Sequence, residues 1–590
     1  MNYMDKYNEW RNNPYFDKET KEELLNLEGN EKEIEDRFYK DLEFGTAGLR
    51  GVIAAGTNRI NIYTVRRATF GLANYIIKNT TEEEKNRGVV IAHDNRHMSR
   101  EFCLEAANTL AACGIKAYIF DSLRTTPELS FAVRNLNTIA GIVITASHNP
   151  PEYNGYKVYW EDGAQVMPHI ANAITEEINS IHDYSTIPTL TEENKNLVVT
   201  LDEKADTEFI EAVKKQVIRK ELIEKVGKEF KIVFTPLCGT GNKPIRRALS
   251  EVGFENILVV KEEENPDPNF AGIEYPNPEE QKALTRGIEL AKENGADLVI
   301  ATDPDCDRVG VAVKTTTGDY ALLTGNQIGG LLTDYIIEGL KEKGELKENS
   351  TLIKTIVTSE FGADIAKANN VEVLNVLTGF KFIGEKIKSF EENNNEKTYL
   401  FGYEESYGYL VGTHARDKDG VVASVLISEM AAYYYSKGMS LYEGLMSLYE
   451  LLVQILSVYE ERKYGFFKEK TISITLKGIE GLAKIKDIIS YFRENEVSSM
   501  GDFKVIDMKD YSKGVDGLPK ADVLKFFLED GSWVAIRPSG TEPKLKFYIA
   551  VKGIDENEAT NKLNNINKYI DSTVNSLVIE NKEAASKLFC

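Results

Sequence analysis

The stretch "IAGIVITASHNPPEYNGYKVYW" (residues 139–160) joins an apolar run to a polar loop. Residues 139–145 suit a buried strand, and Ser147 and His148 follow directly, ahead of paired prolines and a glycine. In α/β proteins, the rigid sheet aims the loops at its strand ends, and those loops usually carry the chemistry. The stretch therefore predicts an α/β fold with Ser147 in a functional loop.

Strand-like runs alternate with helical patterns on both sides of this stretch, which is typical of parallel or mixed α/β sheets. This alternation of strand and helix patterns begins again twice along the chain. In each of the resulting units, one strand is followed by an unusual polar loop. The runs that support this reading are residues 88–94, 116–121, 231–242, 296–305, 350–359, 371–380 and 398–406.

The two ends of the chain differ from this central part. Residues 1–40 are charged and helical in pattern, and after a helical stretch at 422–457 the strands "TISITL", "WVAIRPSG" and "KLKFYIAVKG" alternate with helices. We expect three similar mixed α/β domains followed by a smaller α+β domain. Their expected bounds are 1–205, 206–325, 326–455 and 456–590.

Composition limits the classes of function. The chain has 590 residues, 42% of them hydrophobic, and a net charge of −22, which argues against nucleic acid or an anionic membrane as partner. An anionic substrate would therefore need a local group of Arg and Lys. The polar N-terminus, the lack of any apolar run near about 20 residues and five sparse cysteines without metal-ligand spacing predict a soluble, cytoplasmic protein.

"DPDCDR" (303–308) follows the apolar run "LVIA" and is the best candidate for a metal site. Asp303, Asp305 and Asp307 stand at alternate positions and offer oxygen ligands to a hard cation such as Mg²⁺. An EF-hand loop is excluded because Arg308 stands where that loop needs glycine and Lys314 where it needs glutamate. A solvated acidic turn is the other interpretation.

Three further loops carry weaker signals. "RPSGTEPK" (537–544) offers an arginine fork with hydroxyl and backbone donors for a phosphate, or is an ordinary turn. "GYEESYG" (402–408) places Glu404 and Ser406 on one face if it is extended, which suits sugar hydroxyls. "FGTAGLRG" (44–51) is glycine-rich and carries a single Arg50.

Ser147 fits two chemistries. A serine hydrolase would need G-x-S-x-G, but Thr145 and Asn149 stand at the glycine positions. A serine that carries a phosphoryl group needs mainly positioning and charge neutralisation, which the aspartate and arginine loops offer. "GTGNKP" (239–244) lacks the G-K-[ST] ending of a P-loop, which disfavours a nucleotide kinase.

The four motifs "TASHNP", "DPDCDR", "GYEESYG" and "RPSGTEPK", in this order and spacing, resemble the α-D-phosphohexomutase superfamily. The match runs from "FGTAGLRG" to "RPSGTEPK", which is nearly the whole chain. "AHDNRHMS" (92–99) and "TGFKFIGEKI" (378–387) are most similar to the branch of phosphoglucomutases that includes the phosphopentomutases.

The resemblance implies four domains around a central cleft, with Ser147 as the phosphoserine and the three aspartates as ligands of Mg²⁺ together with its phosphate. Lys157 matches the general acid/base, and His148 either orients the serine loop or transfers a proton. Arg50 would lie near the phosphoserine and Arg308 beside the metal loop. The implied substrate contacts are Thr46, Arg308, Thr378, Gly379, Glu404, Ser406 and Lys418, and the implied phosphate contacts are Arg537, Ser539, Gly540 and Thr541.

The implied reaction interconverts glucose 1-phosphate and glucose 6-phosphate through glucose 1,6-bisphosphate, so the expected partner is a small phosphosugar; the oligomeric state stays open. A phosphopentomutase, a sugar-bisphosphate synthase and a non-catalytic sugar-phosphate binder are the alternatives; the intact serine, lysine and aspartates disfavour the last. Phe380 and Gly408 stand where phosphomannomutase-type relatives have histidines, and Tyr403 replaces a common glycine. These departures bear on which sugar the protein uses rather than on the type of reaction.

Overall fold

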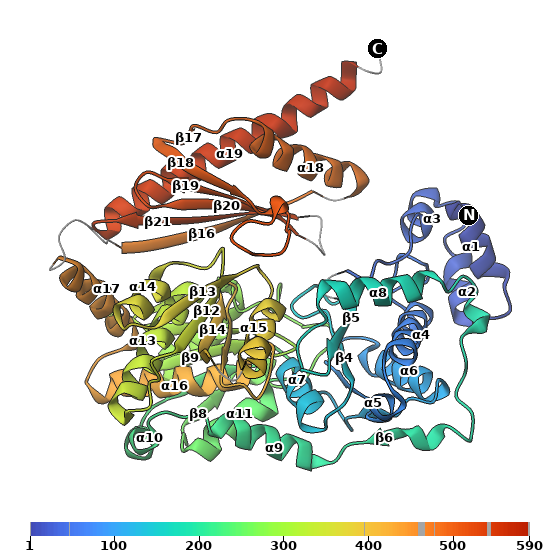
Figure 1. Cartoon of the computed structure of the whole chain (residues 1–590), viewed down its shortest axis with the longest axis horizontal. Helices are drawn as coiled ribbons and strands as arrows, with labels where there is room; N and C mark the ends of the chain where they lie inside the picture. Colours follow the sequence, from blue (N-terminus) through green and yellow to red (C-terminus); the bar gives the residue numbers. More distant parts are fainter. Residues whose placement is uncertain are drawn as a thin grey trace. The chain divides into compact units, whose positions relative to one another are not determined.

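The computed structural model describes residues 2–45, 48–393, 396–457, 466–476, 478–539 and 544–587. The chain divides into two compact units (Figure 1). The first unit comprises Met1–Lys354, Asn369–Leu374 and Gly379–Glu443, and the second comprises Thr355–Ala368, Asn375–Thr378 and Gly444–Cys590.

Three short helices open the first unit, as the sequence predicts: α1 (Tyr3–Asn12), α2 (Lys18–Leu25) and α3 (Glu31–Phe38). Asn2, Asp17 and Asn30 cap them by accepting backbone N–H groups of the first turn. The helices are held by an aromatic cluster in which Trp10 stacks on Phe16, with ring centroids 4.3 Å apart.

The first sheet is mixed, with the strand order β1-β5-β4-β2-β3-β6. Val89 and Ile91 face one hydrophobic cluster, formed with helices α4, α6 and α8, while Val90 and Ala92 face a second cluster formed mainly with α7. Both faces are therefore buried, which explains the continuous apolar runs. The elements are β1 (Leu49–Val52), α4 (Ile62–Asn79), α5 (Glu82–Asn86), β2 (Val89–His93), α6 (Ser99–Ala112), β3 (Ala117–Ile119), α7 (Thr126–Asn135), β4 (Ala140–Ile144), β5 (Tyr153–Trp160), α8 (Pro168–Asn179) and β6 (Val198–Thr200).

The second sheet has the order β11-β10-β9-β7-β8, and the third has the order β13-β12-β14-β15. Helix α12 packs on β7 and β9, and the buried helix α16 contacts β9, β10 and β15. The elements are α9 (Glu203–Lys214), α10 (Lys220–Val226), β7 (Ile232–Thr235), α11 (Asn242–Val252), β8 (Ile257–Val259), α12 (Thr285–Asn294), β9 (Leu298–Thr302), β10 (Val309–Lys314), β11 (Tyr320–Leu323), α13 (Gly325–Lys343), β12 (Ser350–Thr355), α14 (Phe361–Ala368), β13 (Glu372–Val376), α15 (Phe380–Glu392), β14 (Thr398–Glu404), β15 (Gly408–Val411), α16 (Gly420–Ser436) and α17 (Leu441–Ser457).

Each of these three sheets contains an antiparallel hairpin whose connection is one of the predicted polar loops. The hairpins are β4–β5, β9–β10 and β14–β15, and their innermost strand pairs include Ile144 with Tyr156, Thr302 with Val309 and Glu404 with Gly408. A loop tied to strands at both ends has little freedom, so the sheet fixes its position.

The second unit contains an antiparallel sheet with the order β16-β21-β20-β19-β18-β17. Helices α18 and α19 share one hydrophobic cluster with alternate residues of β19, β20 and β21 and lie on the same side of the sheet (Figure 1). The elements are β16 (Phe466–Thr475), α18 (Gly478–Glu494), β17 (Ser499–Met500), β18 (Phe503–Asp510), β19 (Leu524–Leu528), β20 (Trp533–Pro538), β21 (Lys544–Gly553) and α19 (Glu556–Lys587).

This architecture confirms the predicted class of three mixed α/β domains and a smaller α+β domain; the predicted domain bounds stay a prediction. One local expectation is wrong: β14 ends at Glu404, and residues 405–407 form a turn in which Tyr407 has a left-handed φ of 63°. Glu404 and Ser406 therefore do not share a face of one strand. In the described part of the chain, no helix combines the length and apolar character needed to cross a membrane.

Candidate active site

Ser147 lies in the β4–β5 connection, immediately beyond the buried end of β4. Its backbone is left-handed, with φ at 52°, and its N–H donates to the Thr145 hydroxyl at 2.8 Å. The Ser147 hydroxyl donates to Oδ2 of Asp303 at 2.7 Å and lies 3.1 Å from Nδ1 of His148. The turn thus aims the hydroxyl at the aspartate loop of another sheet.

Asp303, Asp305 and Asp307 converge in the β9–β10 connection. All three are buried, and one carboxylate oxygen of each lies within 4.8 Å of the others. Among the described residues, Oδ1 of Asp305 and Oδ1 of Asp307 have no hydrogen-bond partner. Buried carboxylate oxygens without partners are costly, so this group suits a bound metal ion with oxygen ligands.

The charges in this loop are strongly coupled. Burial raises the pKa of Asp303 well above its usual range, and the neighbouring charges of Asp305 and Asp307 raise it further. Burial opposes ionisation of Asp305 too, but the charge of Lys157 and the hydrogen bonds that this carboxyl accepts together lower its pKa. The same buried surroundings thus shift the pKa values of Asp303 and Asp305 in opposite directions.

Two buried lysines face the aspartates. Lys157 extends from β5, where it pairs with Val143, and its Nζ lies 2.8 Å from Oδ2 of Asp305. Lys418 precedes helix α16, and its Nζ lies 3.1 Å from Oδ2 of Asp307. Burial disfavours both ammonium groups, but the adjacent carboxylates raise the pKa of both above the usual lysine value. Both lysines are therefore cationic at neutral pH.

Two arginines flank these loops. Arg50, on β1, donates to the side-chain oxygen of Asn149 at 3.3 Å, within the serine loop. Arg308 directly follows Asp307, and its guanidinium pairs with Glu279. Its backbone N–H donates to Oδ1 of Asp303 at 3.0 Å, so this residue also shapes the aspartate loop.

The β14–β15 connection places Glu404 beside Gly379, whose N–H donates to Oε1 of Glu404 at 2.8 Å. Ser406 is half-buried in the following turn. A Cβ atom at Gly408 would lie 2.1 Å from Cδ of Lys418. The missing side chain at 408 therefore lets Lys418 reach Asp307, which gives a physical reason for the absence of a histidine here.

The remaining predicted residues belong to the second unit or lie outside the described residues. Thr378 belongs to the second unit, as do Arg537, at the end of β20, and Ser539, whose N–H donates to the carbonyl of Lys544 at 2.7 Å. Thr46, Gly540 and Thr541 lie outside the described residues.

Sequence reasoning missed two supporting residues. Thr126, the first residue of α7, donates its hydroxyl to Oδ2 of Asp305 at 2.8 Å. Asp417 accepts from the Tyr159 hydroxyl at 2.7 Å and pairs with Lys418 at 3.0 Å. Thr126 carries no motif in the sequence, whereas Asp417 lies next to the predicted Lys418 in a polar run after an apolar strand.

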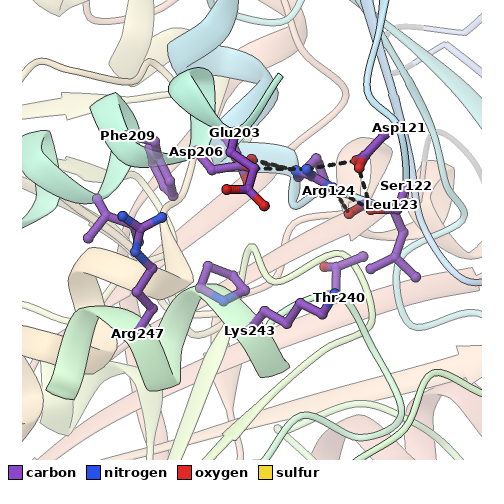
Figure 2. A pocket seen from close by; sticks show the side chains of 13 residues that line it. Asp121, Ser122, Leu123, Arg124, Glu203, Asp206, Phe209, Thr240, Lys243 and Arg247 are labelled. Atoms are coloured by element: carbon purple, nitrogen blue, oxygen red, sulfur yellow. Dashed lines mark hydrogen bonds and ion pairs between the residues drawn. The ribbon is translucent and has the colours of Figure 1, made fainter. Parts of the chain in front are cut away.

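A cavity of about 280 Å³ lies beside the aspartate loop but includes none of the predicted site residues among those that line it. Figure 2 shows Arg124 bridging Asp206 and Asp121 on one wall, with Lys243 across the cavity. Thr240, also in the wall, donates to the carbonyl of Pro304 in the aspartate loop at 2.8 Å. Thr240 thus connects the wall of this cavity to the aspartate loop.

Four family models match the chain in order. They are described as phosphoglucomutase/phosphomannomutase alpha/beta/alpha domain I at residues 41–185, domain II at 207–318, domain III at 324–452 and the C-terminal domain at 483–561. Together they match most of the chain.

Curated relatives extend over nearly the same length. A phosphoglucomutase of Staphylococcus aureus (strain MRSA252) is 36% identical over 550 residues, covering 90% of this chain and 94% of its own. The phosphoglucomutase of strain MSSA476 is 35% identical over 549 residues with the same coverage.

Two solved structures share the fold. A putative phosphomannomutase from Thermus thermophilus superposes with a TM-score of 0.67 at 22% identity, covering 91% of this chain and 99% of that one. The open form of the phosphoprotein pp63/parafusin, a phosphoglucomutase from Paramecium, gives a TM-score of 0.67 at 19% identity, covering 91% and 96%.

Proposed function

The chain belongs to the α-D-phosphohexomutase superfamily, and from that premise we propose that it is a phosphoglucomutase interconverting glucose 1-phosphate and glucose 6-phosphate. One observation carries the proposal: the Ser147 hydroxyl lies 2.7 Å from a buried aspartate cluster in which two carboxylate oxygens accept no hydrogen bond from the described residues. The name and coverage of the Staphylococcus relatives support glucose as the sugar.

In the proposed reaction, the phosphoserine form of Ser147 gives its phosphoryl group to the 6-hydroxyl of glucose 1-phosphate. The bond between phosphorus and Oγ of Ser147 breaks, a bond between phosphorus and the sugar oxygen forms, and the hydroxyl proton leaves to a base. The resulting glucose 1,6-bisphosphate turns over in the site. The bond between phosphorus and O1 of the sugar then breaks, a bond between that phosphorus and Oγ of Ser147 forms, the serine hydroxyl proton passes to a base and O1 takes up a proton, so that glucose 6-phosphate is released.

Most of the proposed roles use groups described above. Lys157 is cationic beside Asp305, so it is placed to give a proton to an oxygen from which the phosphoryl group departs. Arg50 holds the serine loop through Asn149, and His148 lies within hydrogen-bond distance of the Ser147 hydroxyl. Glu404, Gly379, Ser406, Lys418, Thr378, Thr46 and Arg308 are proposed to contact the sugar and its phosphates.

Asp303, Asp305, Asp307 and the Ser147 phosphate would hold Mg²⁺, because carboxylate and phosphate oxygens are the ligands that this cation prefers. When bound, Mg²⁺ would neutralise negative charge on the phosphoryl oxygens. Arg537, Ser539, Gly540 and Thr541 are proposed to hold the phosphate that is not being transferred. A soluble metabolic enzyme with unpaired cysteines at 103, 113, 238 and 306 is consistent with action in the cytoplasm.

A coupled assay tests the substrate. The purified enzyme, with Mg²⁺ and the matching sugar bisphosphate, should show a higher kcat/KM for glucose 1-phosphate than for ribose 1-phosphate or mannose 1-phosphate. A higher kcat/KM for ribose 1-phosphate would instead identify a phosphopentomutase. Net formation of bisphosphate without isomerisation would identify a bisphosphate synthase.

A further inference from the structure

Arg96 is a buried arginine behind the serine loop. It follows β2, which pairs in parallel with β4, so the segment after His93 lies at the same sheet edge as the segment after Ile144. No part of the Arg96 side chain is exposed to solvent. An arginine without solvent contact must find partners for its N–H groups inside the protein.

The partners of Arg96 lie mainly in one loop. A guanidinium has five N–H donors, and the two terminal nitrogens of Arg96 donate to the carbonyl oxygens of Pro150 at 2.8 Å, Tyr153 at 3.1 Å, Ser147 at 2.5 Å and Asn149. The remaining nitrogen, Nε, forms an ion pair with Oδ2 of Asp94 at 3.4 Å. The four terminal N–H groups are thus bound to the loop, and none of them is left for a substrate.

Other residues hold Arg96 in place. Asp94 accepts from the backbone N–H of Arg96 at 2.9 Å and from the Ser99 hydroxyl at 2.6 Å. The ring of Phe270 lies 5.0 Å from the guanidinium carbon of Arg96. The cation is therefore fixed on several sides before it contacts the serine loop.

The carbonyls that Arg96 binds stand around the strained residue of the loop. A left-handed backbone costs about 1 kcal/mol or more for a residue other than glycine, and Ser147 has φ at 52°. One nitrogen of Arg96 binds the carbonyls of Ser147 and Asn149 together. This fixes the orientation of the peptides that follow Ser147 and opposes relaxation of the turn.

We propose that Arg96 is a positioning residue for phosphoryl transfer: it holds the left-handed turn at Ser147 so that Oγ faces the aspartate cluster, and it contacts neither sugar nor phosphate. The inference deepens the proposed function and rests on it. Because Arg96 acts on the serine loop and not on the substrate, its loss should lower kcat and leave KM nearly unchanged.

Three variants test this inference in the full-length enzyme. Arg96→Ala should lower kcat roughly 100- to 1000-fold, since small misplacement of a reacting group has a cost of this order, with KM within about threefold. Guanidinium chloride at tens of millimolar should raise the kcat of Arg96→Ala at least about tenfold. The added guanidinium can occupy the space left by the Arg96 side chain and donate to the same carbonyls. Arg96→Lys keeps the charge but not the fork, and should lower kcat roughly 10- to 100-fold.

Arg67→Ala is the matched control. Arg67 is also buried in this domain and donates to the Ile178 carbonyl at 3.2 Å and to Asp41 at 2.7 Å, away from the serine loop. This variant should lose thermal stability, keep kcat within about twofold per folded molecule and show no response to guanidinium.

Several results would overturn the inference: wild-type kcat in Arg96→Lys, a rise in KM at unchanged kcat, or a folded Arg96→Ala that does not respond to guanidinium. If Arg96→Ala does not fold, the kcat of Arg96→Lys tests the inference. Phosphate incorporation at Ser147 from a sugar bisphosphate, followed by intact-mass spectrometry, separates the two proposals. If the wild-type protein takes up phosphate at Ser147 but isomerises no phosphosugar, the proposed function is contradicted. In that case, slower phosphate uptake at Ser147 in the Arg96 variants than in the wild type would still support the inference about Arg96.

Discussion

The serine loop and the aspartate loop have the same hairpin geometry, but different groups contact them from the rest of the protein. Each connects an antiparallel hairpin at the end of a buried strand, and each contains a residue other than glycine with a left-handed backbone, Ser147 at φ 52° and Cys306 at φ 59°. Behind the serine loop lies the buried cation of Arg96, bound by backbone carbonyls. Behind the aspartate loop lie the hydroxyls of Thr126 and Thr240.

The two loops differ in whether their buried oxygen atoms accept hydrogen bonds from the described part of the protein. The backbone carbonyls of the serine loop find their donors within the protein, whereas Asp305 and Asp307 each keep a buried carboxylate oxygen without a hydrogen-bond partner in the described part of the chain. A protein tolerates such groups when a ligand completes them. The comparison therefore indicates that the serine loop is preformed, while the aspartate loop is completed by a cation.

Ser147→Ala should have the largest effect, because it removes the proposed phosphoryl carrier and leaves the rest of the site intact. We expect kcat to fall by at least about 10⁴-fold, with little change in the melting temperature. Mass spectrometry should find one phosphate on the peptide of residues 145–157 in the active wild-type protein and none in the variant. Full mutase activity in Ser147→Ala would falsify the assignment.

Asp305→Asn should have the next largest effect, since it removes one charge from the loop that needs a cation. We expect kcat to fall roughly 1000-fold and Mg²⁺ to bind more weakly, while folding is maintained. Chelation with EDTA should stop turnover of the wild-type enzyme, and added Mg²⁺ should restore it. Activity that is insensitive to EDTA would contradict the proposed metal site.

Arg537→Ala extends the comparison to a third loop, which follows β20 of the second unit. The proposed role is to hold the phosphate that is not transferred, so KM for glucose 1-phosphate should rise and kcat should fall. Loss of one charge-assisted contact should reduce kcat/KM roughly 30- to 1000-fold. Ser147 should still accept phosphate; a wild-type kcat/KM would show that this loop does not hold the phosphate.

Thr126→Val should have the smallest effect and tests the support behind the aspartate loop. The substitution keeps the volume but removes the hydroxyl that donates to Asp305, so kcat should fall roughly 2- to 10-fold. Thr109→Val is the control, because the Thr109 hydroxyl only donates to the Glu105 carbonyl of its own helix. Equal activities of the two variants would show that the hydroxyl of Thr126 does not support catalysis.

The sequence predicted the parts of this molecule that depend on local pattern. The apolar runs at 139–145 and 296–305 became β4 and β9, because both faces of these strands are buried. Ser147 and Asp303 were predicted as site residues because polar side chains directly follow these strands. The family resemblance then supplied Lys157 and Lys418, whose spacing in the sequence carries no chemical signal.

Long-range contacts could not be predicted in this way. Arg96 and Thr126 meet the two loops only because β2, β4 and α7 pack together, and although Arg96 stands in the motif "AHDNRHMS", nothing in either local sequence indicates which loop the residue contacts. A polar residue just after β2 could still have been considered, since Arg96 obeys the same strand-end rule as Ser147. The expectation that Ser406 continues β14 was wrong because a turn at 405–407 overrides alternation.

The close contact between Gly408 and Lys418 has a consequence for how this site can change over evolutionary time. A side chain at 408 would occupy the space that Lys418 uses, because its Cβ would lie 2.1 Å from Cδ of the lysine. A relative with a bulky residue at 408 therefore needs a different arrangement of the side chain at 418. A side chain at 408 requires a change in the lysine, either a new path for its Cγ and Cδ atoms or a shorter residue at 418, so the two positions should vary together.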